Sequence, residues 1–263
     1  MSPQSDWYGR AMDASMRMTS GGNSCVLVSA WSGRPVSPAD VMSLLRATFS
    51  LFDRIGGDLC GPWRFGVGDS RESARFVDVS AMSDEALLGF VESLFDGERP
   101  ERGFSYSLRR GDVITSTGWS TQNGALLTFG LGTRKGDYFA VRGDRDQLGA
   151  STTMRENATT LVADFVAILR PAYVSFQDRS LHQREIAFWD SHQSGMRRWP
   201  AWGYVAYLSD SVARGLNSVM VGAATQRIDS GWLMSTNTQD PDQAAAIWRD
   251  LHDRKCIHHL PEM

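Results

Sequence analysis

The side chains that could act as nucleophiles are few and lie far apart along the 263 residues. Nucleophilic catalysis needs a serine in a GxSxG turn, or a cysteine beside a histidine and an orienting acid. The sequence contains no GxSxG, and Cys25 and Cys60 lie in no local catalytic signature. His182 and His192 could approach these cysteines only through the fold. The sequence therefore indicates no catalytic centre.

Four potential zinc ligands crowd the C-terminal end of the chain. Imidazole and thiolate groups suit zinc, but no CxxC or HExxH pattern accompanies them. The end of a chain is also seldom preorganised for ligation. We therefore expect no metal and no cofactor. The four residues are His252, Cys256, His258 and His259.

A glycine-rich run at residues 130–136 has a composition similar to that of phosphate-binding loops. Such loops need a helix to follow, because the helix N-terminus binds the anion. Residues 137–141 instead have the apolar pattern of a strand. The run therefore predicts a hairpin turn.

Residues 84–101 form an acidic segment, with six acidic side chains and one basic side chain. Neighbouring carboxylates can perform acid–base catalysis, although exposed helix charge is the simpler interpretation. Glu85, Glu92 and Asp96 fall near one helix face because their spacings are seven and four. We predict that this face attracts a basic partner, with a merely solvated surface as the alternative.

Nine tryptophans are many for a chain of this length. Tryptophan is enriched at the centres of protein interfaces, but it also fills hydrophobic cores. Trp199 and Trp202 are the candidate contact residues, and core packing is the main role expected of Trp202.

The overall composition indicates a globular protein in a reducing compartment. Apolar residues make up 42% and charged residues 22%, and the net charge of −3 gives no footprint for nucleic acid or an anionic membrane. No stretch approaches the roughly 18 apolar residues of a membrane helix, and the N-terminus lacks a signal-peptide pattern. Three distant cysteines argue against a disulfide framework. We therefore expect a cytoplasmic location.

The periodicity predicts about four helices and a run of antiparallel strands. Ser37, Pro38 and Asp40 give a strong helix start, and Gly56 a helix end. The other helices are expected to follow Ser83, to span residues 157–169 and to follow Asp240. Strands are expected at residues 25–31, 104–108, 113–117, 126–131, 138–141, 173–176, 202–208, 218–223 and 231–235. Residues 56–68 are expected to form a loop.

This order predicts an α+β fold in which a meandering antiparallel sheet packs against the helices. We expect residues 1–23 to be a flexible segment, residues 24–255 to form one domain, and residues 256–263 to be a tail. A weak rhythm of helix followed by strands suggests two similar halves, at about 24–150 and 151–255.

The run from Pro200 to Ser209 resembles a strand of the immunity protein 52 family of bacterial polymorphic toxin systems. The matching pattern is Gly-aromatic-x-x-Tyr-Leu-Ser at residues 203–209. Residues 103–108, the glycine-bearing strand at 126–132, and residues 169–173 follow in the order that the resemblance implies. Together these segments cover about residues 40–215.

The resemblance implies an antitoxin that binds and blocks a cognate toxin, commonly a nuclease with a restriction-endonuclease-like domain. Such a nuclease presents a basic cleft for phosphates, so an acidic or aromatic surface could cover it without chemistry of its own. The candidate toxin contacts are Glu85, Glu92, Asp96, Trp199 and Trp202. The alternative is a small intracellular hydrolase or transferase with a dispersed active site, and a structural role in an assembly comes third.

Overall fold

A ten-stranded antiparallel sheet runs through the protein. The computed structural model describes residues 26–32, 37–67, 75–94, 104–110, 114–115, 118–119, 125–131, 137–143, 149–191, 199–213, 216 and 222–260. From edge to edge the strands are β11 (Ala224–Ile228), β12 (Gly231–Ser235), β10 (Val205–Ser209), β9 (Tyr173–Asp178), β1 (Val26–Ser32), β8 (Asp137–Gly143), β7 (Ala125–Leu131), β4 (Phe104–Arg110), β2 (Arg64–Val67) and β3 (Arg75–Asp78). A separate ribbon pairs β5 (Ile114–Thr115) with β6 (Gly118–Trp119).

The predicted α+β class with an antiparallel sheet is confirmed. Strands β4, β7 and β8 form an antiparallel meander, and β7 pairs with β8. The strand predicted at 113–117 is not part of it, because β5 pairs with β6 in the separate ribbon and β4 pairs directly with β7. To the ten-stranded sheet, residues 24–150 contribute six strands and residues 151–255 contribute four, and the two groups meet where β1 pairs with β9. The strand order differs between the two groups.

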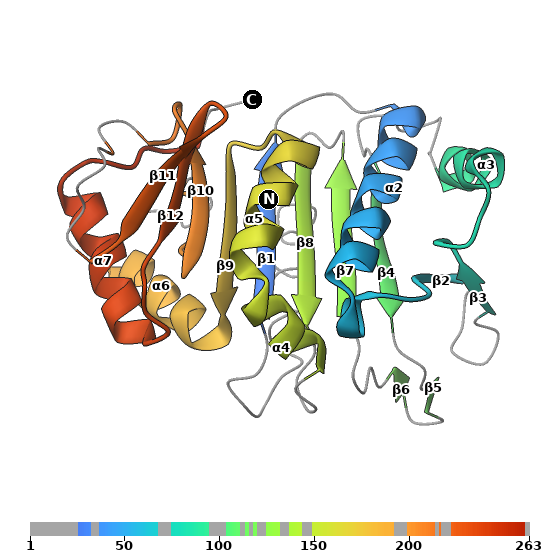
Figure 1. Cartoon of the computed structure of the whole chain (residues 1–263), viewed down its shortest axis with the longest axis horizontal. Helices are drawn as coiled ribbons and strands as arrows, with labels where there is room; N and C mark the ends of the chain where they lie inside the picture. The colour runs from blue at the N-terminus through green and yellow to red at the C-terminus, as the bar shows by residue number, and fades with distance from the viewer. Residues whose placement is uncertain are drawn as a thin grey trace, which may run out of the picture.

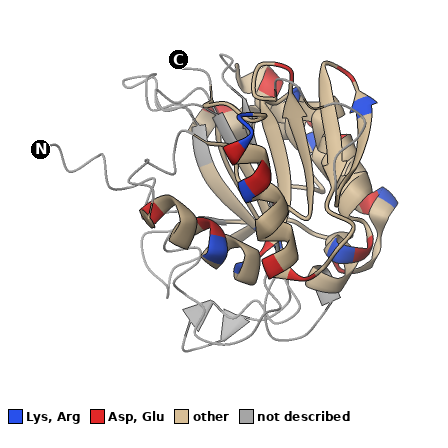
Figure 2. Cartoon of the chain, turned by 90° about the vertical axis from the view of Figure 1, so that its left-hand side faces the viewer, with Lys and Arg blue, Asp and Glu red and all other residues tan. Residues whose placement is uncertain are grey.

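Helices cover both faces of the sheet (Figure 1). On the near face lie α2 (Pro38–Ile55), η2 (Gly57–Leu59), α4 (Gly149–Glu156) and α5 (Ala158–Leu169), with α3 (Asp84–Leu94) packed beside α2. On the far face α6 (Arg179–Ser191) packs against α7 (Pro241–Asp253), and Figure 2 shows helices on the two sides of the strands. No helix in the described part of the chain is long and apolar enough to cross a bilayer.

Helix α2 begins and ends as the sequence predicts. The backbone N–H of Ser37 donates to Asp40 Oδ2 at 2.8 Å, and the N–H of Asp40 donates to Ser37 Oγ at 3.2 Å. This reciprocal capping box fixes the first turn. Gly56 ends the helix with a φ of 74°, a value that glycine adopts without a steric penalty.

The apolar face of α2 joins the core between the near helices and the sheet. Phe52 is fully buried, stacks on Trp63 at 4.9 Å between ring centroids and meets the edge of Phe165 at 6.4 Å. Phe165 of α5 in turn contacts Phe139 of β8 at 5.0 Å. These aromatic contacts connect α2 and α5 to the centre of the sheet.

Six elements are missing from the sequence prediction: α4, α6, η2, β2, β3 and β6. The loop expected at residues 56–68 was therefore wrong in part, because it contains η2 and β2. Helix α6 has apolar residues at helical spacing, but its buried face also includes His182 and Glu185. These polar side chains masked the amphipathic pattern, which normally separates apolar from polar residues. Strands β2 and β3 have four residues each, too few to show a period.

The predicted strands near the C-terminus are shifted in the structure. The strand predicted at 202–208 begins later, at Val205. Residues 218–221 of the next predicted strand lie outside the described residues, and β11 begins at Ala224. Strand β12 has the predicted limits.

Gly203 stands where two backbone segments approach closely. A Cβ at this position would lie 2.6 Å from the carbonyl oxygen of Val205 and 3.0 Å from that of Phe176. The carbonyl oxygen of Gly203 also accepts a hydrogen bond of 2.8 Å from the indole N–H of Trp248. The glycine of the 203–209 pattern is therefore required by the fold.

We expect Gly203→Ala to lower the free energy of unfolding by about 1–3 kcal/mol, because only backbone movement can relieve the overlap. Gly89→Ala is the matched control, since a Cβ at Gly89 in α3 would meet nothing within 4 Å. This control should gain about 0.5–1 kcal/mol from its helix propensity and reduced unfolded-state entropy. Urea denaturation of both variants measures the difference, and equal effects would contradict the argument.

Candidate functional site

An open cleft of about 280 Å³ lies between the α4–α5 segment and the loop that follows β12. Its floor is made by Phe176 and Val205, and its walls carry hydroxyl, amide and charged groups. The lining residues are Arg155, Glu156, Ala158, Thr159, Phe176, Tyr204, Val205, Ser235, Asn237, Thr238 and Gln239. Concave sites with a few convergent polar groups are the usual places where proteins bind ligands, so this cleft is the first candidate site.

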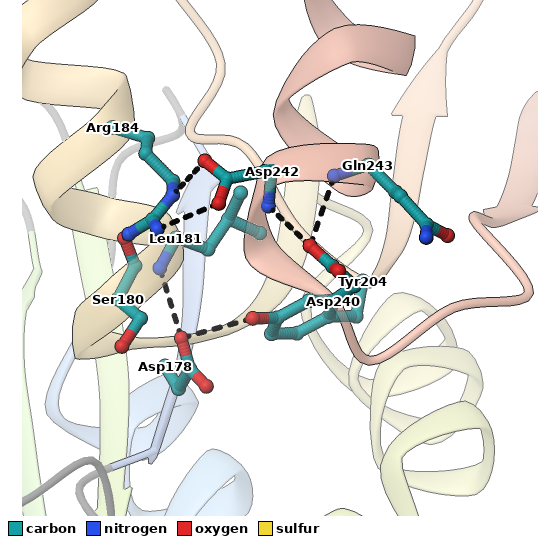
Figure 3. A network of polar contacts seen from close by, with 8 residues as sticks. All are labelled: Asp178, Ser180, Leu181, Arg184, Tyr204, Asp240, Asp242 and Gln243. Carbon is teal, nitrogen blue, oxygen red and sulfur yellow. Dashed lines mark hydrogen bonds and ion pairs between the residues drawn. The ribbon is translucent and has the colours of Figure 1, made fainter.

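Tyr204 and Asp178 form the buried polar centre beside the cleft (Figure 3). The Tyr204 hydroxyl donates to Asp178 Oδ1 at 3.1 Å, and the same oxygen accepts the backbone N–H of Leu181 at 2.9 Å. The other oxygen of Asp178 forms an ion pair with Arg155 at 3.4 Å. Asp178 thus joins the end of β9 to the first turn of α6, to α4 and to the segment that leads into β10.

A second set of polar contacts fixes the start of α7 near this centre (Figure 3). Arg184 of α6 forms a bidentate ion pair with Asp242, at 2.6 and 3.0 Å. The side chain of Asp240 caps α7 by accepting the backbone N–H groups of Asp242 and Gln243. The hydrogen bond to Arg184 lowers the pKa of Asp242, so the pair stays ionised at neutral pH.

Tyr204 and Asp178 are held in fixed protonation roles by their surroundings. Burial, followed by the charge of Asp178 and the hydrogen bond to it, raises the pKa of Tyr204. Tyr204 therefore remains a hydrogen-bond donor at neutral pH and is not a base. Both oxygens of Asp178 already have partners, which leaves this carboxylate poorly placed to accept a proton from a substrate.

Cys60 shows no activation for nucleophilic chemistry. The Cys60 thiol donates to Asp53 Oδ1 at 3.4 Å, and this hydrogen bond, with burial, raises the pKa of the thiol. A reactive cysteine needs a lowered pKa. His182 lies on α6, on the opposite face of the sheet from η2 and Cys60, so the structure does not bring the two together. Cys25 and His192 lie outside the described residues.

His182 is part of a buried polar cluster under α6. Its Nδ1 lies 3.3 Å from Glu185 Oε2, and Glu185 Oε1 accepts the backbone N–H of Trp202 at 3.3 Å. The side chain of Gln177 is oriented so that its amide nitrogen donates to Glu185 Oε2 and to the carbonyl oxygen of Trp202. This cluster fastens α6 to the far face of the sheet and to the start of β10.

An aromatic cluster adjoins these polar groups at the ends of α6 and α7. Trp199 stacks on Trp189 at 5.0 Å and contacts His252 and His259, while Trp202 lies parallel to Trp248 at 6.5 Å. The indole N–H groups of Trp189, Trp199 and Trp202 are buried and have no acceptor in the part of the chain that is described.

The predicted contact residues do not form one surface. Glu85 and Glu92 are exposed on α3, beside the β2–β3 end of the sheet, whereas Asp96 lies outside the described residues. Trp199 is half-buried at the α6–α7 end, and Trp202 is fully buried, which removes it from the accessible surface. Strand β10, which follows Trp199 and Trp202, is seven strand spacings, or roughly 34 Å, from β3, which precedes α3.

The C-terminal residues considered as zinc ligands have other partners. His252 and His259 pack on Trp199, and Ile257 forms an isolated bridge with Ala213. Cys256 Sγ faces the carbonyl oxygen of Arg254 at 3.9 Å. No group of three or more potential ligands converges within the described ranges.

The sequence analysis did not predict the cleft, although two residues at or beside it lie in recognisable sequence patterns. Tyr204 is the aromatic residue of the 203–209 pattern, and Asp178 precedes a helix start as N-cap residues do. Arg155 and the loop residues Asn237 and Gln239 carry no recognisable pattern. They become neighbours only when the sheet brings β9, β10 and β12 together.

These features define an α+β protein with one long antiparallel sheet, a saturated polar centre and an open cleft. No protein-family model matches the chain, and no curated protein matches its sequence. Among solved structures, the chain is similar to the Pseudomonas aeruginosa T6SS protein PA0821, with a TM-score of 0.51. The similarity covers 95% of this chain and 83% of that one at 11% sequence identity, so it shows a shared fold.

The buried hydroxyl of Tyr204 gives a test of the polar centre. We expect Tyr204→Phe to lower the free energy of unfolding by about 1–2 kcal/mol near pH 7, because Asp178 loses a donor in a buried setting. The pKa of Tyr204 is raised in the folded state, so its contribution is complete below about pH 10, the pKa of an unperturbed tyrosine, and is lost above it.

Urea denaturation of wild type and Tyr204→Phe between pH 8 and pH 11 measures this effect. The difference in unfolding free energy between the two proteins should shrink as the pH rises above 10. A difference that stays constant or grows over this range would show that the hydroxyl does not remain protonated in the fold.

Proposed function

We propose that this chain is an immunity protein that neutralises a cognate bacterial toxin by stoichiometric binding. The observation that carries the proposal is the similarity of nearly the whole chain to a T6SS protein of Pseudomonas aeruginosa. Toxins of secretion systems endanger the cells that make them, so a protective binding protein is a natural member of such a system. The resemblance of residues 203–209 to the immunity protein 52 family supports the same role.

The packing of the 203–209 pattern explains why it marks a fold and not a contact surface. Gly203 permits a close backbone approach, and Tyr204, Tyr207 and Leu208 are buried. Proteins that share this pattern can therefore share the sheet while their exposed surfaces diverge. This division suits immunity proteins, in which a common scaffold presents a surface matched to one toxin.

The polar centre beside the cleft, together with Cys60, supports binding without turnover. Asp178, Tyr204 and Arg184 are held by partners within the protein, and Cys60 has a raised pKa. A site of this kind can recognise a partner through hydrogen bonds, but it supplies no activated nucleophile or base. We therefore propose an inhibitor that needs neither a metal nor a cofactor.

We further propose that the toxin is a nuclease with a basic cleft and that the exposed side of α3 steers its approach. Glu85 and Glu92 are exposed on this helix, and no basic residue occurs within it. Complementary charges accelerate association, most strongly at low ionic strength. A nuclease meets its nucleic acid in the cytoplasm, so the protecting protein would act there.

The direct test is co-expression of the toxin encoded beside this chain, with and without the chain, followed by purification. We expect the toxin alone to kill the cells, and the chain to restore growth and to co-purify with the toxin. A harmless neighbouring protein that never co-purifies would overturn the proposed pairing. Rescue without a complex would instead indicate that the chain acts as an enzyme.

Charge reversal on α3 tests the proposed steering. The double variant Glu85→Lys/Glu92→Lys should lower the association rate with the toxin about tenfold at low ionic strength, and the loss should shrink at high salt. The matched control, Asp190→Lys/Asp253→Lys, makes the same change in net charge at exposed residues of α6 and α7. Stopped-flow or surface-based kinetics measure both. An equal loss in the control would contradict a contact at α3.

A further inference from the structure

Strand β11 forms an exposed edge of the ten-stranded sheet. Among the strands of the described residues it pairs only with β12, over five residue pairs. Ala224, Gln226 and Arg227 are exposed, and this end of the sheet faces the viewer in Figure 2. An edge strand presents unpaired backbone N–H and C=O groups that can bind another strand.

The hairpin geometry determines which backbone groups point outward. A two-residue loop, Asp229 and Ser230, joins Ile228 to Gly231, and these two residues pair. The closing pair of a two-residue hairpin exchanges hydrogen bonds, and the bonded and non-bonded pairs then alternate along the strand. Thr225 and Arg227 therefore direct their N–H and C=O groups away from β12.

Three of the features that protect natural edge strands are absent from β11. Natural edges are protected by proline, lysine or a bulge, but β11 contains neither residue type, and its register with β12 is uninterrupted. The charged side chain of Arg227 is held by Asp210 through two hydrogen bonds and lies over the ring of Trp232. The Arg227 side chain is thus held against Asp210 and Trp232 of its own chain.

We infer that β11 pairs with β11 of a second copy of this chain, antiparallel and across a two-fold axis at Gln226. In that arrangement Thr225 of each copy lies opposite Arg227 of the other, and their outward backbone groups can form four hydrogen bonds. Gln226 faces its own symmetry mate. The ten-stranded sheets of the two copies then form one continuous sheet.

The sequence of β11 is complementary to itself in this register. Ile228 faces Ala224 of the other copy, so the two apolar side chains at the ends of the strand meet. Arg227 faces Thr225, so no like charges lie directly opposite each other, an arrangement that would destabilise the pair. A two-fold interface requires this self-complementarity. The inference is independent of the toxin and of the proposed function.

The position of Gln226 on the axis gives a specific test by sedimentation and light scattering of the purified chain. We expect the wild type to be a dimer at micromolar concentration. Gln226→Lys and Gln226→Glu each place two like charges directly opposite each other and should raise the dimer dissociation constant about tenfold or more. An equimolar mixture of the two variants should restore the dimer, because lysine then faces glutamate.

Gln183→Lys is the matched control, since Gln183 is an exposed residue of α6 away from β11, and this variant should dimerise as the wild type does. The inference would be overturned if the wild type stayed monomeric at micromolar concentration and at up to about 100 times that concentration. It would also be overturned by a dimer that survives both Gln226 variants, or by a mixture that fails to restore pairing.

Discussion

Strand β1 is hydrogen-bonded on both sides, to β8 over seven residue pairs and to β9 over six. The pairing with β9 is the single seam between the six strands from the N-terminal part of the chain and the four from the C-terminal part. Helix α5 packs across this seam, against β1, β9 and β10. Without the β1–β9 pairing the ten-stranded sheet would divide into these two groups of strands.

The same seam explains why the polar centre is structural. Asp178 is the last residue of β9. Its carboxylate accepts hydrogen bonds from the first turn of α6 and from the hydroxyl of Tyr204, and it forms an ion pair with Arg155 on α4. Each partner comes from a different element, so the carboxylate fixes how these elements meet. A buried carboxylate needs such partners to remain charged. Both oxygens of Asp178 therefore have partners within the protein.

The sequence predicted the fold where local chemistry and burial agree. The capping box at Ser37 and Asp40 located α2, and alternating apolar residues located β4 and β9. The sequence analysis did not predict α6, because its buried face includes His182 and Glu185, which contact each other, and Glu185 also accepts a hydrogen bond from the distant Trp202. The cleft was also out of reach, since Arg155, Tyr204 and Asn237 become neighbours only through sheet pairing. Glu85 and Trp199, predicted together as contacts, lie at opposite ends of the sheet.

We propose that this chain inhibits its toxin by stoichiometric binding and not by enzymatic turnover. Titration of a fixed concentration of the toxin with increasing amounts of this chain, well above the dissociation constant, tests it most directly. We predict that toxin activity falls linearly and reaches zero when one chain is present per toxin molecule. Loss of activity that continues with time at substoichiometric amounts of the chain would contradict the claim and would identify an enzyme that modifies the toxin or its product.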